Sequence, residues 1–272
     1  MNRRLAAFVA PGALLLLAAA GLVARSGPRT LPAWPSPAHP LGVDVLGRDF
    51  FWVLTRGAAE LALPAAAAVL GVGAVLAARL WFATARPVLE EAPTGEAPPW
   101  LLLSAPPRLL LVMLAMLPLD QPSTAVAAAV VAALHLPVAL AELDVRLAAL
   151  RANEVLAGLV AHGLSVRRIV ARHLLAGHLR EPVERLSRVL LVQVAFTQLA
   201  LGAVFGGSAV TEARSVSWGM ELRRYAAALP VGSLTCPPEG ACPPLVATMH
   251  GALLLLACVL LLGGTLAGAR RP

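Results

Sequence analysis

The segment "HPLGVDVLGRD", residues 39–49, holds a histidine, two aspartates and an arginine together with two glycines. Side chains of these types form ion pairs and exchange protons, and an arginine can bind a carboxylate through two parallel hydrogen bonds. We expect Asp44, Arg48 and Asp49 to pair with one another or with residues 217–224. The favoured role is a structural clamp that gates neighbouring elements, and direct contact with a substrate is the alternative.

Histidines and carboxylates also gather in residues 173–184, where a metal ion is the first site to consider. His173 and His178 stand five residues apart, which turns them about 140° from each other around an α-helix. Glu181 and Glu184 follow, but no His-Glu-x-x-His sequence occurs. We therefore predict no metal site and no cofactor.

The chain lacks residues that several catalytic mechanisms require. All 22 basic residues are arginine, so a P-loop lysine, a Schiff-base lysine and a Ser–Lys dyad are excluded. No G-x-S-x-G sequence is present either. We predict that the chain is not an enzyme.

Two cysteines, Cys236 and Cys242, flank the segment "PPEGA" in a region that we place outside the membrane. An oxidising exterior favours a short-loop disulfide with a structural role, and two free thiols are the alternative. Cys258 falls in the last apolar stretch and is expected to serve packing. His135 and His250, within or beside apolar stretches, are expected to be packing histidines that hydrogen-bond to a neighbour, and a functional role within the membrane is the alternative.

The composition indicates that membrane helices position these residues. The chain of 272 residues is 58% hydrophobic and 14% charged, whereas about a quarter of the residues of a soluble domain are charged. Apolar stretches of about 20 residues recur, which is the length that crosses a bilayer as a helix. Too little polar sequence remains to cover a soluble core. The chain is therefore predicted to be an integral membrane protein.

Six apolar stretches divide the chain. Arginines and a proline-rich linker flank the first, which we expect to be an uncleaved helix and not a signal peptide. An amphipathic stretch at residues 50–57 precedes the second. We expect a domain at residues 1–57, with the first helix and an external linker, and a five-helix core at 58–272 with a cytoplasmic loop at about 141–188. The six predicted spans are residues 5–24, 58–78, 106–119, 124–140, 189–207 and 246–268.

Six crossings place both termini on one side of the membrane. With that side cytoplasmic, the inner segments hold fourteen arginines and the outer segments seven, with Arg108 at a boundary. The positive-inside rule favours this orientation. Because most charges flank spans, the net charge of +7 does not indicate nucleic-acid binding.

The signature at residues 39–49 closely resembles "HPLGTDxxGRD", a segment of the permease subunits of dipeptide, oligopeptide and nickel ABC importers. In that family, in the C-type permease branch, it lies outside the membrane between the first two spans, as hydropathy places it here. The matching positions are His39, Pro40, Gly42, Asp44, Gly47, Arg48 and Asp49.

Two further segments match the same family in the same order. Residues 150–175, "LRANEVLAGLVAHGLSVRRIVARHLL", resemble the family's cytoplasmic loop "LRxxEYVxAARALGASxxRIxxRHILP". Ser217, Trp218 and Gly219 are similar to the start of the "SWGxML" segment before the last span. Within the loop, the matching positions are Leu150, Arg151, Glu154, Gly163, Ser165, Arg168, Ile169, Arg172, His173 and Leu175.

The loop has the features of a short surface helix that could dock into a groove of a separate ATPase. Residues 152–162 suit a helix, and Gly163 supplies a turn where a side chain would be costly. We expect Ser165 to cap the following helix through its hydroxyl. Arg168 and Arg172, four residues apart, would share a face near the lipid headgroups, and anchoring to anionic lipid is the alternative role.

The chain also departs from the family pattern. Ala157, Gly158 and Leu159 stand where the family has Glu-Ala-Ala, and Ala176 stands where it has proline. The glycine-rich loop after the second span, "AGYxGG", is absent. Glu154, one turn earlier, is a candidate to replace the missing carboxylate.

The resemblance implies an all-α membrane bundle of about six spans with the type I ABC importer permease fold. It implies transport of peptides or similar small solutes, nickel included, across the cell inner membrane by alternating access. The implied partners are a second permease subunit, two ATP-binding subunits, an extracytoplasmic solute-binding protein and membrane lipid, with no nucleic acid. The alternative is a degenerate permease-like subunit with a structural or regulatory role.

Overall fold

The structure is a computed structural model, and the described residues are mostly helical, with no strand among them. Outside the helices, two isolated antiparallel bridges join Val43 to Ala33 and to Asp49. The structure describes residues 3–24, 27, 30–85, 108–118, 123–152, 155–205, 216–228 and 242–267.

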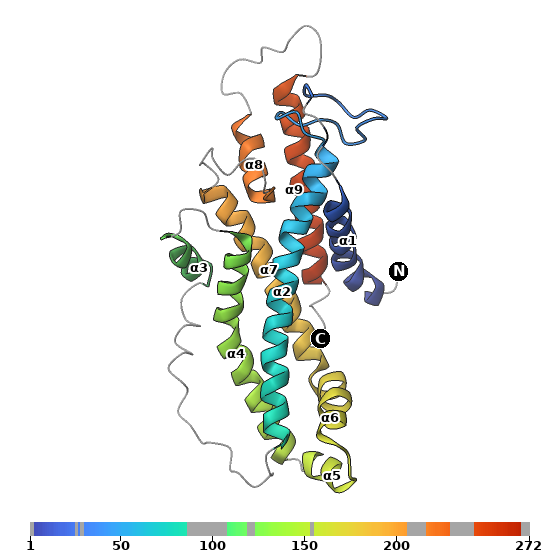
Figure 1. The fold of residues 1–272 in the computed structure, drawn as a ribbon, viewed down its shortest axis with the longest axis vertical. Helices are drawn as coiled ribbons and strands as arrows, with labels where there is room; N and C mark the ends of the chain where they lie inside the picture. The colour runs from blue at the N-terminus through green and yellow to red at the C-terminus, as the bar shows by residue number, and fades with distance from the viewer. Residues whose placement is uncertain are drawn as a thin grey trace. The chain divides into compact units, whose positions relative to one another are not determined.

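Figure 1 shows the helices of the described residues. Phe50–Ala83, Thr124–Leu150 and Pro243–Leu261 are long and apolar enough to cross a membrane. The chain is therefore a helical membrane protein. The elements are α1 (Arg3–Val23), α2 (Phe50–Ala85), α3 (Arg108–Met116), α4 (Thr124–Ala152), α5 (Val155–Ala161), α6 (Val166–Arg168), the π-helix η2 (Ile169–His178), α7 (Arg180–Phe205), α8 (Trp218–Ala227) and α9 (Pro243–Ala267).

Each of the six predicted spans overlaps one of these helices, but the bounds differ. The amphipathic residues 50–57 form the first two turns of α2 and are not a separate element. Helix α3 has nine residues, which at about 1.5 Å each cover less than half of a hydrocarbon core of about 30 Å. Helix α4 continues well past the predicted end at residue 140.

Contacts divide the chain into two compact units. The first comprises Met1–Ala65, Leu119–Ala125 and Val192–Pro272, and the second comprises Ala66–Pro118 and Val126–Leu191. The predicted domain boundary between residues 57 and 58 falls inside α2 and inside the first unit.

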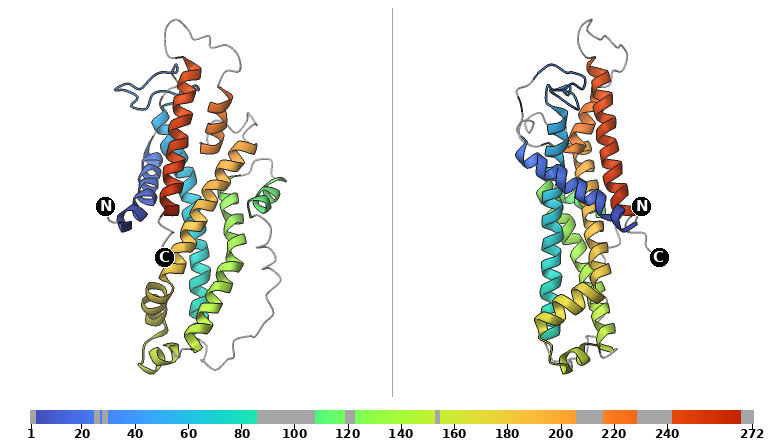
Figure 2. Two further views of the ribbon diagram at one scale, coloured as in Figure 1. Left: turned by 180° about the vertical axis from the view of Figure 1, so that it is seen from behind. Right: turned by 90° about the vertical axis from the view of Figure 1, so that its right-hand side faces the viewer.

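Close helix contacts in the first unit depend on glycine. Helices α1 and α8 both pack against α9 (Figure 2). A Cβ atom on Gly21 of α1 would lie 2.1 Å from the carbonyl oxygen of Thr55 in α2. A Cβ atom on Gly219 of α8 would lie 2.5 Å from the carbonyl oxygen of Leu199 in α7. Small residues let membrane helices approach in this way.

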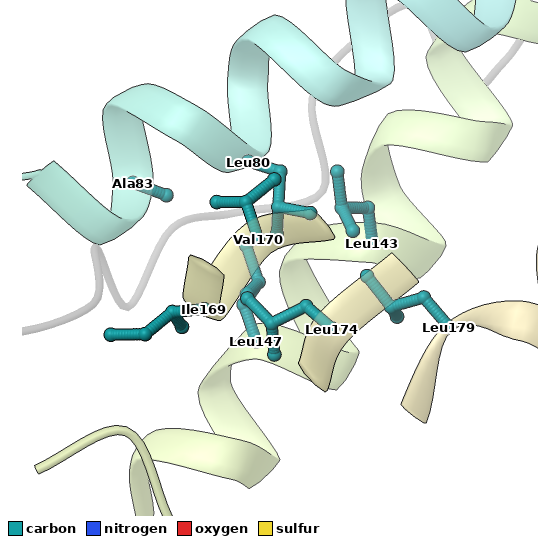
Figure 3. Close-up of a cluster of buried hydrophobic side chains, with 8 residues drawn as sticks. All are labelled: Leu80, Ala83, Leu143, Leu147, Ile169, Val170, Leu174 and Leu179. Carbon is teal, nitrogen blue, oxygen red and sulfur yellow. The ribbon is translucent and has the colours of Figure 1, made fainter. Parts of the chain in front are cut away.

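The second unit has its own apolar core, shown in Figure 3. Leu80 and Ala83 come from α2, and Leu143 and Leu147 lie four residues apart on one face of α4. Segment η2 contributes three residues and the turn after it contributes Leu179. The core is made of Leu80, Ala83, Leu143, Leu147, Ile169, Val170, Leu174 and Leu179.

Candidate functional site

The signature at residues 39–49 folds around two glycines and one aspartate. Gly42 and Gly47 adopt φ angles of 81° and 75°, which side chains disfavour. The Oδ1 atom of Asp44 accepts hydrogen bonds from the backbone N–H groups of Leu46 and Arg48, at 2.9 and 2.8 Å. Such a bond to a backbone group two residues on forms an Asx-turn. This turn directs the Arg48 side chain back toward Asp44.

Arg48 joins the signature to α8. Its guanidinium donates from Nε and Nη2 to Asp44 Oδ2, at 2.9 and 2.6 Å. It also donates from Nη1 and Nη2 to the two oxygens of Glu221, at 3.1 and 2.6 Å. Asp44 and Glu221 are fully buried. The predicted pairing of the signature with residues 217–224 is therefore present, and we call these three residues the clamp.

A second arginine balances the charge of the clamp. Arg224 Nη1 donates to Glu221 Oε1 at 2.8 Å, so that two buried carboxylates face two guanidinium groups. Although burial by itself lowers the pKa of Arg48, its hydrogen bonds and the charges of Glu221 and Asp44 raise that pKa above its usual value. The guanidinium group of Arg48 thus stays charged, which strengthens the hydrogen bonds that it donates.

Tyr225 closes one side of the clamp. Its hydroxyl lies 3.4 Å from Asp44 Oδ2, and the side chain is buried. Burial, followed by the negative charges of Asp44 and Glu221, raises the pKa of this hydroxyl above its usual value. The hydroxyl therefore stays protonated and can donate to Asp44.

An aromatic group ties α9 to the same place. The ring of His250 stacks on Phe50, with centroids 4.1 Å apart and an interplanar angle of 21°. His250 Nε2 lies 2.8 Å from the carbonyl oxygen of Leu41, a group that only accepts, so this nitrogen is the donor. His250 is thus a packing histidine with a hydrogen-bonded neighbour, as expected. It fastens the start of α9 to the signature loop.

Asp49 acts at the start of α2 and not on Arg48. Its Oδ1 atom accepts from the N–H group of Phe51 at 2.8 Å, which is an N-cap of α2. Its Oδ2 atom lies 2.8 Å from His39 Nδ1. Pro40 lies in the turn between His39 and Gly42. The signature thus supplies one carboxylate for the clamp and another for the helix start.

Trp218 joins α8 to α2. Its Nε1 atom donates to the carbonyl oxygen of Leu54 at 3.1 Å. Its ring occupies the space beside Gly57, where a Cβ atom would lie 2.2 Å from the ring. Ser217 stands at the N-cap of α8 but makes no side-chain capping bond. Trp218 and Gly219, which match the family segment, therefore both lie at helix contacts.

Sequence reasoning did not single out Glu221, Tyr225 or Phe50. The usable signals were weak: Glu221 lies between Trp218 and Arg224 on one helix, and Tyr225 is the single tyrosine of the chain. Both are distant in sequence from Arg48, and their burial depends on tertiary packing.

The predicted coupling loop occupies one end of the second unit. Helix α5 ends in two backbone bonds, from Gly163 N–H to Val160 O at 2.9 Å and from Leu164 N–H to Leu159 O at 3.3 Å. Gly163 has a φ of 72°. This is a Schellman motif, in which the left-handed residue after the helix is usually glycine. The turn predicted at Gly163 is present.

Two details of the predicted loop are wrong. Ser165 occupies the N-cap of α6, but its hydroxyl makes no capping bond. The expected α-helix through Arg172 ends at Arg168, and residues 169–178 form the π-helix η2 instead. Its bonds run between residues five apart, as from Leu179 N–H to Leu174 O at 2.7 Å. Within this π-helix, Ile169, Val170 and Leu174 are buried in the core of the second unit.

The exposed side of the loop is small and uncharged near its tip. Ala157, Gly158 and Gly163 are exposed, whereas Leu159 packs against the core of the second unit. Arg168 and Arg172 are exposed and His173 is half-buried. Glu154, the candidate replacement for the missing carboxylate, lies outside the described residues.

Metal and thiol chemistry is limited in the described part of the chain. No group of three or more His, Cys, Asp or Glu side chains there could hold a metal ion. Cys242 is disulfide-bonded, and Cys258 is a buried free thiol. Cys236, the predicted partner of Cys242, lies outside the described residues.

Comparison of the chain with protein-family models and with curated proteins gives no match. The functional argument therefore rests on the motifs and on the geometry of the clamp and the loop.

Proposed function

We propose that the chain is the permease subunit of an ATP-driven importer for peptides or similar small solutes. It would contribute about six spans to one half of a translocation pore in the cell inner membrane. A second permease subunit, two ATP-binding subunits and an extracytoplasmic solute-binding protein would complete the importer. Both termini would be cytoplasmic.

The observation that carries this proposal is the packing of the loop on the spans. Such a subunit needs a surface segment whose displacement moves the membrane helices. Ile169, Val170 and Leu174 share one buried core with Leu80 of α2 and Leu143 of α4. Because packed cores transmit displacement and do not deform continuously, a push on the loop would shift the ends of both helices.

The clamp supports the same proposal from the first unit. Arg48, Asp44 and Glu221 hold the signature, α8 and the adjoining start of α2 together. A buried, fully paired charge network rigidifies the elements that it joins. Rigid elements can turn as bodies during alternating access, in which two conformations expose the solute path to opposite sides.

The test is copurification and uptake with a pair of glycine variants. Gly163 has open space around it but a positive φ, so Gly163→Val strains the turn by about 1–2 kcal/mol. A penalty of that size depopulates the native turn roughly 5- to 30-fold. With the tagged chain in its native membrane, we expect this variant to lose the copurified ATPase and ATP-dependent uptake.

Gly158→Ala is the matched control, because Gly158 is helical and exposed and has open space around it. Alanine at that position stabilises the helix by up to about 1 kcal/mol, so uptake should stay normal. Normal uptake by Gly163→Val would refute the role of the loop. A wild type that inserts and folds but recovers no ATPase would favour the permease-like subunit without transport, which the missing carboxylate in the loop suggests.

A further inference from the structure

A groove with apolar walls runs along the second unit, where α2, α4 and the first turns of α7 meet. The space inside it is about 40 Å³. Val183, on the groove wall, is 38% exposed although it is apolar. The apolar lining is Leu76, Leu80, Ala139, Leu143, Val183 and Leu186. Leu80, Ala139 and Leu143 are buried, whereas Leu76, Val183 and Leu186 are exposed at least in part.

Charge gathers at one edge of this groove. Glu142 and Arg146, one turn apart on α4, line it together with the apolar residues. Glu142 Oε1 accepts from Arg146 Nη2 at 3.2 Å and also from Arg185 Nη2 of α7. One carboxylate oxygen thus serves two guanidinium groups, which leaves one positive charge in excess at the edge.

The arginines at this edge can reach a ligand from solvent. The side chains of Arg146 and Arg185 are 40% and 55% exposed. Guanidinium groups bind phosphate oxygens through charge-assisted hydrogen bonds and are weakly hydrated. An anionic phosphate over this edge would neutralise the excess charge.

The groove also lies within the membrane-spanning parts of α2 and α4, where lipid acyl chains are present. Leu76 and Leu80 fall within the α2 span, and Ala139 and Leu143 fall within the α4 span. Charged residues begin at Glu142 on α4 and occupy the first turns of α7. This change from apolar to charged residues marks a membrane–water boundary.

We propose that this groove binds an anionic membrane phospholipid. An acyl chain lies against the partly exposed lining residues Leu76, Val183 and Leu186, and the phosphate sits over Arg146 and Arg185. Charge complementarity favours an anionic lipid, because an apolar helix in the groove would not neutralise the excess positive charge of the arginines. The inference requires only that the chain is a membrane protein, and it is independent of the transport proposal.

The experiment is native mass spectrometry of the full chain after reconstitution with equal phosphatidylglycerol and phosphatidylcholine. We expect retained phosphatidylglycerol on the wild type. A cationic side chain near an anionic lipid surface gives about a fivefold preference, so Arg146→Gln and Arg185→Gln should each lower this selectivity about fivefold. Arg56→Gln is the control, since it removes the same charge from a pair with Glu60 in the first unit, and selectivity should not change.

Two more variants separate the charge from the groove. Glu142→Gln removes the shared carboxylate and frees both arginines for phosphate, so it should raise retention of phosphatidylglycerol. Val183→Trp fills the groove from an exposed position and should lower lipid retention without a change of charge. Circular dichroism and gel filtration verify that each variant is folded.

Several results would overturn the proposal. Equal retention of both lipids by the wild type would indicate ordinary annular lipid. An equal loss of selectivity in Arg56→Gln would indicate a general charge effect. Cross-linking of Val183→Cys between copies would show that a second copy covers the groove. If an arginine variant does not fold, the lipid selectivity of the wild type and the direction of the Glu142→Gln effect still test whether the groove binds anionic lipid.

Discussion

At the scale of single residues, the clamp shows how a mostly apolar chain keeps buried charges. Asp44 and Glu221 are both fully buried, which would be costly for isolated carboxylates. The guanidinium group of Arg48 binds both carboxylates at once, through four hydrogen bonds of 2.6 to 3.1 Å. A lysine offers a point charge and could not bind both carboxylates in this way.

We therefore expect Arg48→Met to destabilise the protein strongly. Removing one partner of a buried ion pair costs about 3–5 kcal/mol, because the remaining charges stay buried and unpaired. Thermal unfolding in detergent measures the loss. Arg56→Met, which breaks a half-exposed pair with Glu60, should cost no more than about 1 kcal/mol. Similar unfolding temperatures for the two variants would contradict a buried clamp.

Tyr225 predicts an alkaline pH dependence. Its folded pKa is raised by burial and by Asp44 and Glu221, whereas an unfolded tyrosine titrates near pH 10. The folded state then holds the proton more tightly. This contribution to stability is complete below about pH 10 and is lost as the pH rises through the folded pKa.

The check uses the absorbance of tyrosinate, which reports on Tyr225 alone because the chain has one tyrosine. In the folded protein this absorbance should appear only above the ordinary pKa of tyrosine. The free energy of unfolding should fall by at most about 1.4 kcal/mol per pH unit there, and Tyr225→Phe should remove this fall. A folded protein that titrates near pH 10 would show that the hydroxyl is not buried.

At the scale of elements, the helix contacts of the first unit depend on where glycines stand. Gly21 faces the backbone of α2, which cannot move aside as a flexible side chain could. Gly12, on the same helix α1, has nothing within 4 Å of its Cβ position. The two glycines therefore give a matched comparison.

We expect Gly21→Ala to separate α1 from α2 and to destabilise the protein by about 1–3 kcal/mol, the usual cost of overpacking. Gly12→Ala should be neutral or stabilising by up to about 1 kcal/mol, because alanine is the better helix former. Thermal unfolding measures both changes, and limited proteolysis detects the release of α1. Equal behaviour of the two variants would mean that α1 does not pack on α2 at Gly21.

At the scale of the whole molecule, the proposed function predicts that the signature and the loop face opposite sides of the membrane. Single cysteines at the exposed positions Leu46 and Val160 test this in intact cells. A membrane-impermeant maleimide should label Leu46→Cys directly and Val160→Cys only after permeabilisation. Labelling of Val160→Cys from outside would place the loop where no cytoplasmic ATPase could reach it.

The sequence by itself determined what depends on local physics. Hydropathy located the apolar helices, because a spanning helix satisfies its own backbone and needs only a run of apolar side chains. The turn at Gly163 was also predictable, since a left-handed residue after a helix favours glycine. The charged signature was visible as a polar set that an apolar chain would not keep without partners.

Only the tertiary structure decided which partners those were. Arg48 pairs with Glu221 and not with Asp49, and His250 stacks on Phe50. Both contacts join residues some 170 to 200 positions apart. The π-helical register of η2 and the merging of residues 50–57 into α2 also became visible only in the structure. Pairing between distant segments depends on which surfaces meet in the fold, and neither periodicity nor propensity in a single segment carries that information.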